Sequence, residues 1–137
     1  VGNAMNHYSA HPFVELTASQ QMLVERVAKT IYRPCCNNST YFPDCNHGMA
    51  MLGLLEILAA NGVSEPEVYR RALAVNALWF PDAYATIGTY LAQYGKRIDT
   101  ESPKDILGAS FSSGSGLQAV QAKLVPQTQQ GGPGCGV

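Results

Sequence analysis

One run of twelve residues, 49–60, carries Glu56 as its only charged side chain. The run is too short to span a bilayer, which takes about 20 apolar residues. Loop-forming residues precede it, and Gly62 follows as a typical helix-stop residue. The sequence therefore predicts a helix over about 47–61. Because that helix is apolar almost all round, we expect it at the centre of the fold, with other helices packed around it.

Three further main helices and one short helix are expected from helical periodicity and local start and stop signals. Thr17 and Gln20 form a capping-box pattern, and the helix that follows is expected to reach about Tyr32. A second capping box begins at Ser64 and predicts a helix to about Trp79. Further helices are expected over about 81–94 and 117–124, with a turn at 103–107 and a Ser/Gly-rich segment at 110–116 that is flexible by composition.

The alternation of apolar and polar residues that marks strands is nearly absent. We therefore predict an all-α bundle of about four main helices, with an extended N-terminal arm over 1–16 and an irregular C-terminal tail. The 137 residues suit a single helical domain over 1–125, followed by a Gln/Gly/Pro-rich tail over 126–137. A chain of this size can build a core without disulfide staples.

The chain is weakly charged, with a net charge of -1 and 14% charged residues against about 25% in typical domains. No basic field exists to hold nucleic acid, which makes nucleic acid an unlikely class of partner. No membrane span is expected, and the first residues lack the charged and apolar regions of a signal peptide. A polar but weakly charged surface favours a protein partner or a homo-oligomer, and an extracytoplasmic location, periplasmic or secreted.

Three of the four cysteines lie within eleven residues, at Cys35, Cys36 and Cys45, and His47 follows closely. Three thiolates and one imidazole form a recognised tetrahedral set for zinc. The same residue types suit Cu(I) or an iron–sulfur cluster. Cys45 and His47 are expected at the start of a helix, where backbone N–H groups and the helix dipole favour thiolate over thiol.

The same segment resembles the CDGSH-type iron–sulfur motif of mitoNEET-like proteins. The matching residues are Cys36, Ser39, Phe42-Pro43 and Cys45, about a tenth of the chain. In that family the first two cysteines are separated by one residue and the histidine lies four residues past the last cysteine. Here the cysteines are adjacent, and His47 lies two residues past Cys45. The resemblance implies a [2Fe–2S] site and electron transfer.

Disulfides are the main alternative to a metal. Four cysteines allow three pairings, and Cys35 or Cys36 can each pair with Cys45 or with Cys135 in the tail. A bond through Cys135, or a neighbouring chain, would hold the tail in place. Free redox thiols are a third possibility, and then no cofactor is needed.

Three further residues are possible additional ligands: Cys135, which could close the site through the tail, and His7 and His11, which are four residues apart. Pro12 argues against a helix that would bring the two histidines onto one face.

The sequence contains no phosphate-binding glycine loop, no Ser/His/Asp set and no c-type haem motif. We therefore expect a protein that is not an enzyme, binding a metal ion or an iron–sulfur cluster for metal handling or electron transfer, as part of an assembly. The alternatives are a structural or interaction subunit whose cysteines form disulfides, and a thiol redox protein.

Overall fold

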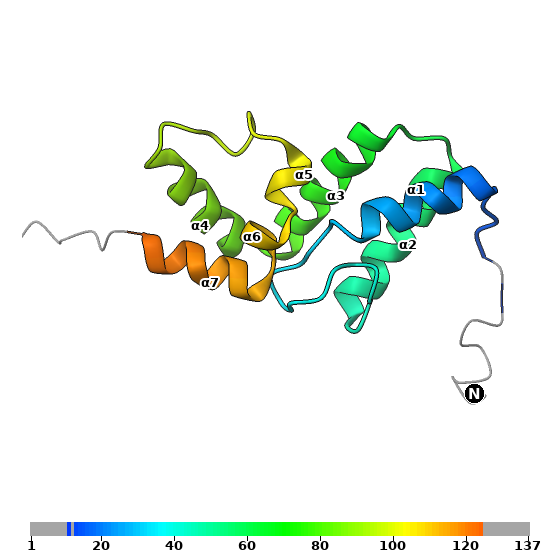
Figure 1. Ribbon diagram of the computed structural model, residues 1–137, viewed down its shortest axis with the longest axis horizontal. Helices are drawn as coiled ribbons and strands as arrows, with labels where there is room; N and C mark the ends of the chain where they lie inside the picture. The colour runs from blue at the N-terminus through cyan, green and yellow to red at the C-terminus, as the bar shows by residue number, and fades with distance from the viewer. Residues whose placement is uncertain (1–10, 12, 125–137) are drawn as a thin grey trace, which may run out of the picture.

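The computed structural model describes residue 11 and residues 13–124. These residues form helices and no strand, as predicted, with one isolated antiparallel bridge between Tyr32 and Ser39. The helices are α1 (Ala18–Ala28), α2 (Asn46–Ala60), α3 (Glu65–Trp79), α4 (Pro81–Ala92), α5 (Pro103–Ile106), α6 (Ala109–Ser112) and α7 (Gly114–Lys123). Figure 1 shows α1 and α2 at one end, α4 and α7 at the other, and α3 and α5 between them. The predicted C-terminal tail lies outside the described residues.

Local signals account for most helix boundaries. Thr17 caps α1 in a reciprocal capping box with Gln20, as predicted. Gly62 and Gly95 follow α2 and α4 with φ of 69°, a left-handed conformation that glycine adopts without strain. The second predicted capping box is wrong, since the Ser64 side chain makes no capping hydrogen bond and α3 begins with Pro66 in its first turn.

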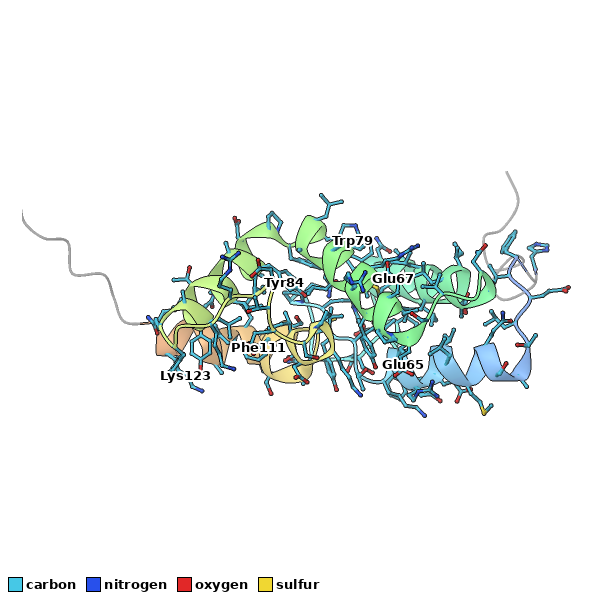
Figure 2. The ribbon with its side chains drawn as sticks, turned by 90° about the horizontal axis from the view of Figure 1, so that it is seen from above. Glu65, Glu67, Trp79, Tyr84, Phe111 and Lys123 are labelled. Carbon is cyan, nitrogen blue, oxygen red and sulfur yellow. The ribbon has the colours of Figure 1, made fainter. Side chains whose placement is uncertain are left out.

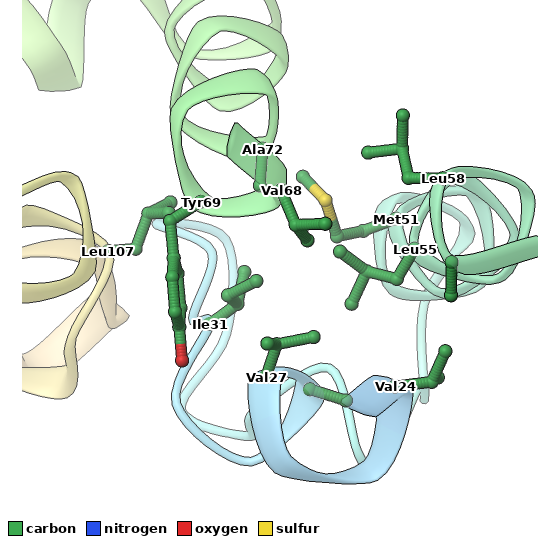
Figure 3. Close-up of a cluster of buried hydrophobic side chains, with 12 residues drawn as sticks. Val24, Val27, Ile31, Met51, Leu55, Leu58, Val68, Tyr69, Ala72 and Leu107 are labelled. Atoms are coloured by element: carbon green, nitrogen blue, oxygen red, sulfur yellow. The ribbon is translucent and has the colours of Figure 1, made fainter. Parts of the chain in front are cut away.

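The larger core joins α1, α2 and α3. Its side chains come from all three helices and from the segments that follow α1 and α5 (Figure 3), and each fully buried aliphatic side chain contributes about 1.5–3 kcal/mol. Fully buried members of this core are Val27, Ile31, Met51, Leu55, Val68, Ala72 and Leu107. This core contains no cysteine, so the three-helix unit is held by apolar packing.

A second core joins α4, α5 and the segment through α7. Tyr84 and Ile87 of α4 pack with Ile106, and Phe111 and Leu117 lie against them. Figure 2 labels Tyr84 and Phe111 in this half of the molecule. The long α3 borders both cores and connects the two halves of the molecule.

Helix α2 is not surrounded on all sides, contrary to the expectation from its composition. Met51 and Leu55 are fully buried, but Met49 and Ile57 remain 48% and 51% exposed. The helix packs against α1 and α3 and leaves its opposite face to solvent. In the described part of the chain, no helix combines the length and apolarity that a bilayer crossing requires.

The Ser/Gly-rich segment 110–116 is ordered, which corrects the expectation of flexibility. Ser113 caps α7 by accepting a hydrogen bond from the Gly116 N–H at 2.9 Å. The buried Ser112 hydroxyl lies 2.8 Å from the Tyr84 hydroxyl and donates to the Ile106 carbonyl at 2.7 Å. Serine hydroxyls therefore satisfy polar groups in the second core, where composition alone suggested a linker.

Replacing Ser112 by alanine should destabilise the protein by about 1–3 kcal/mol, because the Ile106 carbonyl and Tyr84 hydroxyl lose a buried partner. Urea unfolding checks this change. The exposed Ser110 of the same helix is the matched control, and Ser110→Ala should leave the unfolding midpoint nearly unchanged. Equal effects of the two substitutions would contradict the assignment.

Candidate metal centre

The three clustered cysteines lie on one loop, residues 33–45, which connects α1 to α2 and is called the cysteine loop below. The backbone of the loop, and of Tyr32 just before it, is hydrogen-bonded to distant parts of the chain. The Tyr32 N–H donates to the Leu107 carbonyl at 2.9 Å, and the Tyr32 carbonyl accepts from the Asn76 amide of α3 at 2.8 Å. At the other side, the Gly114 N–H donates to the Cys36 carbonyl at 2.9 Å. The loop is thus clamped between the two halves of the molecule.

Arg33 is the first residue of the cysteine loop, and its side chain is completely buried. One of its terminal nitrogens donates to the Thr40 hydroxyl at 3.1 Å. The other donates to Cys36 Sγ at 3.1 Å and lies 3.4 Å from the Asp44 carboxylate. A buried charge is costly unless it is paired and hydrogen-bonded, so these contacts fix the shape of the loop around the guanidinium.

Cys35 Sγ lies 3.7 Å from both Cys36 Sγ and Cys45 Sγ. A disulfide needs a sulfur–sulfur distance of about 2.05 Å, and the three described cysteines are free. Four ligands at a zinc–sulfur distance of about 2.3 Å place neighbouring sulfurs about 3.8 Å apart, by the geometry of a tetrahedron. The observed spacing is close to that value.

His47 lies in the first turn of α2, beside Cys45. Its ring packs against aromatic side chains at the junction of α3 and α4, with centroid distances of 5.5 Å to Trp79 and 4.7 Å to Phe80. One ring nitrogen lies within 4.8 Å of both Cys35 Sγ and Cys45 Sγ, so Cys35, Cys45 and His47 form a group near enough to bind one ion.

A second group of the same kind is formed by Cys36, Asp44 and Cys45, again with ligand atoms within 4.8 Å of one another. Cys45 belongs to both groups. The four predicted ligands Cys35, Cys36, Cys45 and His47 are thus gathered around Cys45 rather than in one equidistant set. Arg33 and Asp44 were not predicted from the sequence as parts of the site. Arg33 lies two residues before Cys35, and Asp44 directly precedes Cys45.

The thiols differ in electrostatic environment. Although the residue as a whole is exposed, partial desolvation of its thiol, followed by hydrogen bonds with Cys36 and Cys45, raises the pKa of Cys35 to about 12. Burial also acts to raise the pKa of Cys45, but hydrogen bonds from the Gly48 N–H, Cys35 and Arg33 outweigh it and lower that pKa. Cys45 is the N-cap of α2, and its sulfur accepts the Gly48 N–H at 3.3 Å. Thiolate stabilisation at this helix start therefore agrees with the prediction from sequence.

Of the three additional predicted ligands, the structure describes His11 alone, and His11 is not brought to the site. His11 is exposed, stands 5.7 Å from the Phe13 ring between centroids and belongs to neither ligand group. His7 and Cys135 lie outside the described residues, so their roles stay predictions. The helical fold also shows that the resemblance to the CDGSH-type motif does not extend to that family's β-rich fold.

Comparison with protein-family models, with curated proteins and with solved structures finds no match for this chain. The function must therefore be inferred from the chain's own residues and geometry.

Gly48 is the residue that lets α2 approach Arg33. A Cβ atom at Gly48 would lie 2.9 Å from Pro43 Cα and 3.0 Å from a guanidinium nitrogen of Arg33. Gly48→Ala should therefore destabilise the protein by about 1–3 kcal/mol. Gly53 of the same helix has nothing within 4 Å of such an atom, so Gly53→Ala should stabilise by up to about 1 kcal/mol. Thermal unfolding should therefore show a lower midpoint for Gly48→Ala and a higher one for Gly53→Ala. A higher midpoint for Gly48→Ala would contradict the close approach of α2 to Arg33.

Thiol reactivity should follow pKa rather than exposure. At neutral pH we expect iodoacetamide to alkylate Cys45 before Cys35, because a lowered pKa increases the thiolate fraction of Cys45 while Cys35 stays protonated. The alkylation rate of Cys35 should increase only in strongly alkaline buffer. Peptide mapping by mass spectrometry over time measures both rates in the metal-free protein. Faster alkylation of Cys35, the more exposed thiol, would show that solvent exposure rather than pKa determines the alkylation rate.

Proposed function

We propose that this protein binds a single zinc ion through Cys35, Cys36, Cys45 and His47 and acts in metal handling. The observation that carries the proposal is the spacing of 3.7 Å from Cys35 Sγ to each of the two other sulfurs. Cysteines that bind different irons of a cluster are held farther apart than cysteines on one ion. The sulfur geometry therefore favours one ion over an iron–sulfur cluster.

The choice of zinc follows from the donor set. Three thiolates and one imidazole are a common tetrahedral zinc set, and zinc imposes no geometric preference of its own. Cys36 and His47 belong to different ligand groups that share Cys45, so in the four-ligand arrangement their side chains must rotate to bring both donor atoms onto the same ion.

The position of the site supports a role in metal handling rather than a structural role for the metal. No described cysteine belongs to either apolar core, so neither core is held together by a metal crosslink. Cys35 is exposed and the other three ligands are half-buried. An ion at this place is close to solvent, where another molecule can donate or receive it.

Zinc titration of the reduced chain, with a chromophoric chelator as competitor, tests the proposal. We expect one ion per chain, with release of protons because the thiols must deprotonate, so that the apparent affinity increases with pH. Cobalt should give the strong visible absorption of a tetrahedral thiolate site. It should also change the emission of Trp79, the only tryptophan, whose ring lies 5.5 Å from His47.

Cys45→Ser should lower zinc affinity by roughly 100-fold. His47→Ala and His11→Ala are a matched pair of histidine variants that should differ in zinc affinity. His47→Ala should weaken binding, and His11→Ala should not. A chain that binds no zinc, or that is purified with iron and inorganic sulfide, would overturn the proposal.

A thiol redox function is the second candidate. It is favoured by the Cys35–Cys45 sulfur distance of 3.7 Å together with the lowered pKa of Cys45. In that case a mild disulfide oxidant would take two electrons and two protons from the pair and form one Cys35–Cys45 bond. Mass spectrometry of the oxidised chain would detect the loss of two hydrogens.

A further inference from the structure

A hollow of about 350 Å³ opens beside the cysteine loop, and Cys35 forms part of its wall. The other walls come from the junction of α3 and α4 and from α7. They include the Trp79 and Phe80 side chains, Pro81 and Leu117, so the lining is mainly apolar. Among the described residues that line it, Asp82 is the only charged one. The same two aromatic side chains pack against His47, so the hollow and the metal ligands share a wall.

Cys35 is the least restrained of the clustered thiols. Cys36 Sγ accepts a hydrogen bond from Arg33 at 3.1 Å, and Cys45 Sγ accepts one from the Gly48 N–H at 3.3 Å. Within the described part of the chain, the hydrogen bonds of Cys35 Sγ are with the other two sulfurs alone. Cys35 is also the exposed member of the set. It is therefore the ligand that can leave a metal with the least disturbance of the loop.

We propose that the hollow binds a small thiol with an apolar, uncharged or cationic body, which exchanges with Cys35 on the bound zinc. This inference rests on the proposed zinc site and adds the route by which the ion enters and leaves. A thiol is expected because an incoming ligand must match the softness of the thiolate that it displaces. The volume is at the lower end of small-molecule pockets, about 300–1,000 Å³, and so suits a small ligand.

The exchange step is balanced without any redox partner. The incoming thiol loses its proton and its sulfur forms a bond to zinc. The bond between zinc and Cys35 Sγ breaks, and Cys35 Sγ takes up the proton. Zinc keeps its charge and its four ligands, and it is then held by Cys36, Cys45, His47 and the small thiol.

The rate of zinc transfer from the loaded protein to a chromophoric chelator tests the exchange. Benzyl mercaptan, whose body is apolar and uncharged, should accelerate transfer roughly tenfold more than mercaptoacetate at equal thiolate concentration, because the hollow buries its ring. Cysteamine, which is cationic, should also exceed mercaptoacetate, because Asp82 attracts it and repels the anion.

Asp82→Lys supplies the decisive variant, since Asp82 is exposed and is not a proposed metal ligand. We expect unchanged zinc affinity and a reversed charge preference, with mercaptoacetate now faster than cysteamine by roughly fivefold. Glu15→Lys, an equal charge change at an exposed position before α1, should change neither quantity.

The outcomes separate the two proposals. A chain without zinc binding overturns both of them. Zinc binding with transfer rates that do not depend on the charge or apolarity of the thiol, or that Asp82→Lys leaves unaltered, overturns the hollow as the exchange site and leaves the zinc site standing.

Discussion

The buried guanidinium of Arg33 is the contact on which the candidate site depends. A cation with no exposed surface is stable only if nearby groups accept its hydrogen bonds, and here those groups are Thr40, Cys36 and Asp44 of the same loop. The Nε of Arg33 has no partner among the described residues, so the contacts of the two terminal nitrogens are the ones that shape the loop and hold Cys36 beside Asp44 and Cys45. Gly48 completes the arrangement, because only a residue without a side chain allows α2 to begin so close to Arg33.

Much of the fold could be predicted from local chemistry. The capping box at Thr17 and the glycines at positions 62 and 95 set helix boundaries through short-range geometry, which a sequence displays directly. The exposed face of α2 could not be predicted, because apolar composition does not reveal how many neighbours a helix has. Nor could the order of segment 110–116, since Ser112 and Ser113 are ordered by partners that only tertiary structure supplies.

The candidate site shows the same division. The spacing of the predicted ligands makes them conspicuous in the sequence, and the structure gathers Cys35, Cys36 and His47 around Cys45 in two overlapping groups. The roles of Arg33 and Asp44 were invisible because a charged residue in a loop is ordinarily solvated. Only the packing of the loop over the guanidinium converts Arg33 from a surface residue into an anchor.

The clamp on the cysteine loop has a consequence for the order of events during synthesis and folding. The Asn37 side chain accepts a hydrogen bond from the Ser115 N–H, across a sequence separation of 78 residues. Contacts of such range form after the intervening chain has been made and folded. A nascent chain thus carries its three thiols well before the clamp that orders them can close. The ordered arrangement of the clustered thiols is therefore a property of the finished fold, and these thiols are least restrained during the interval before residue 115 emerges.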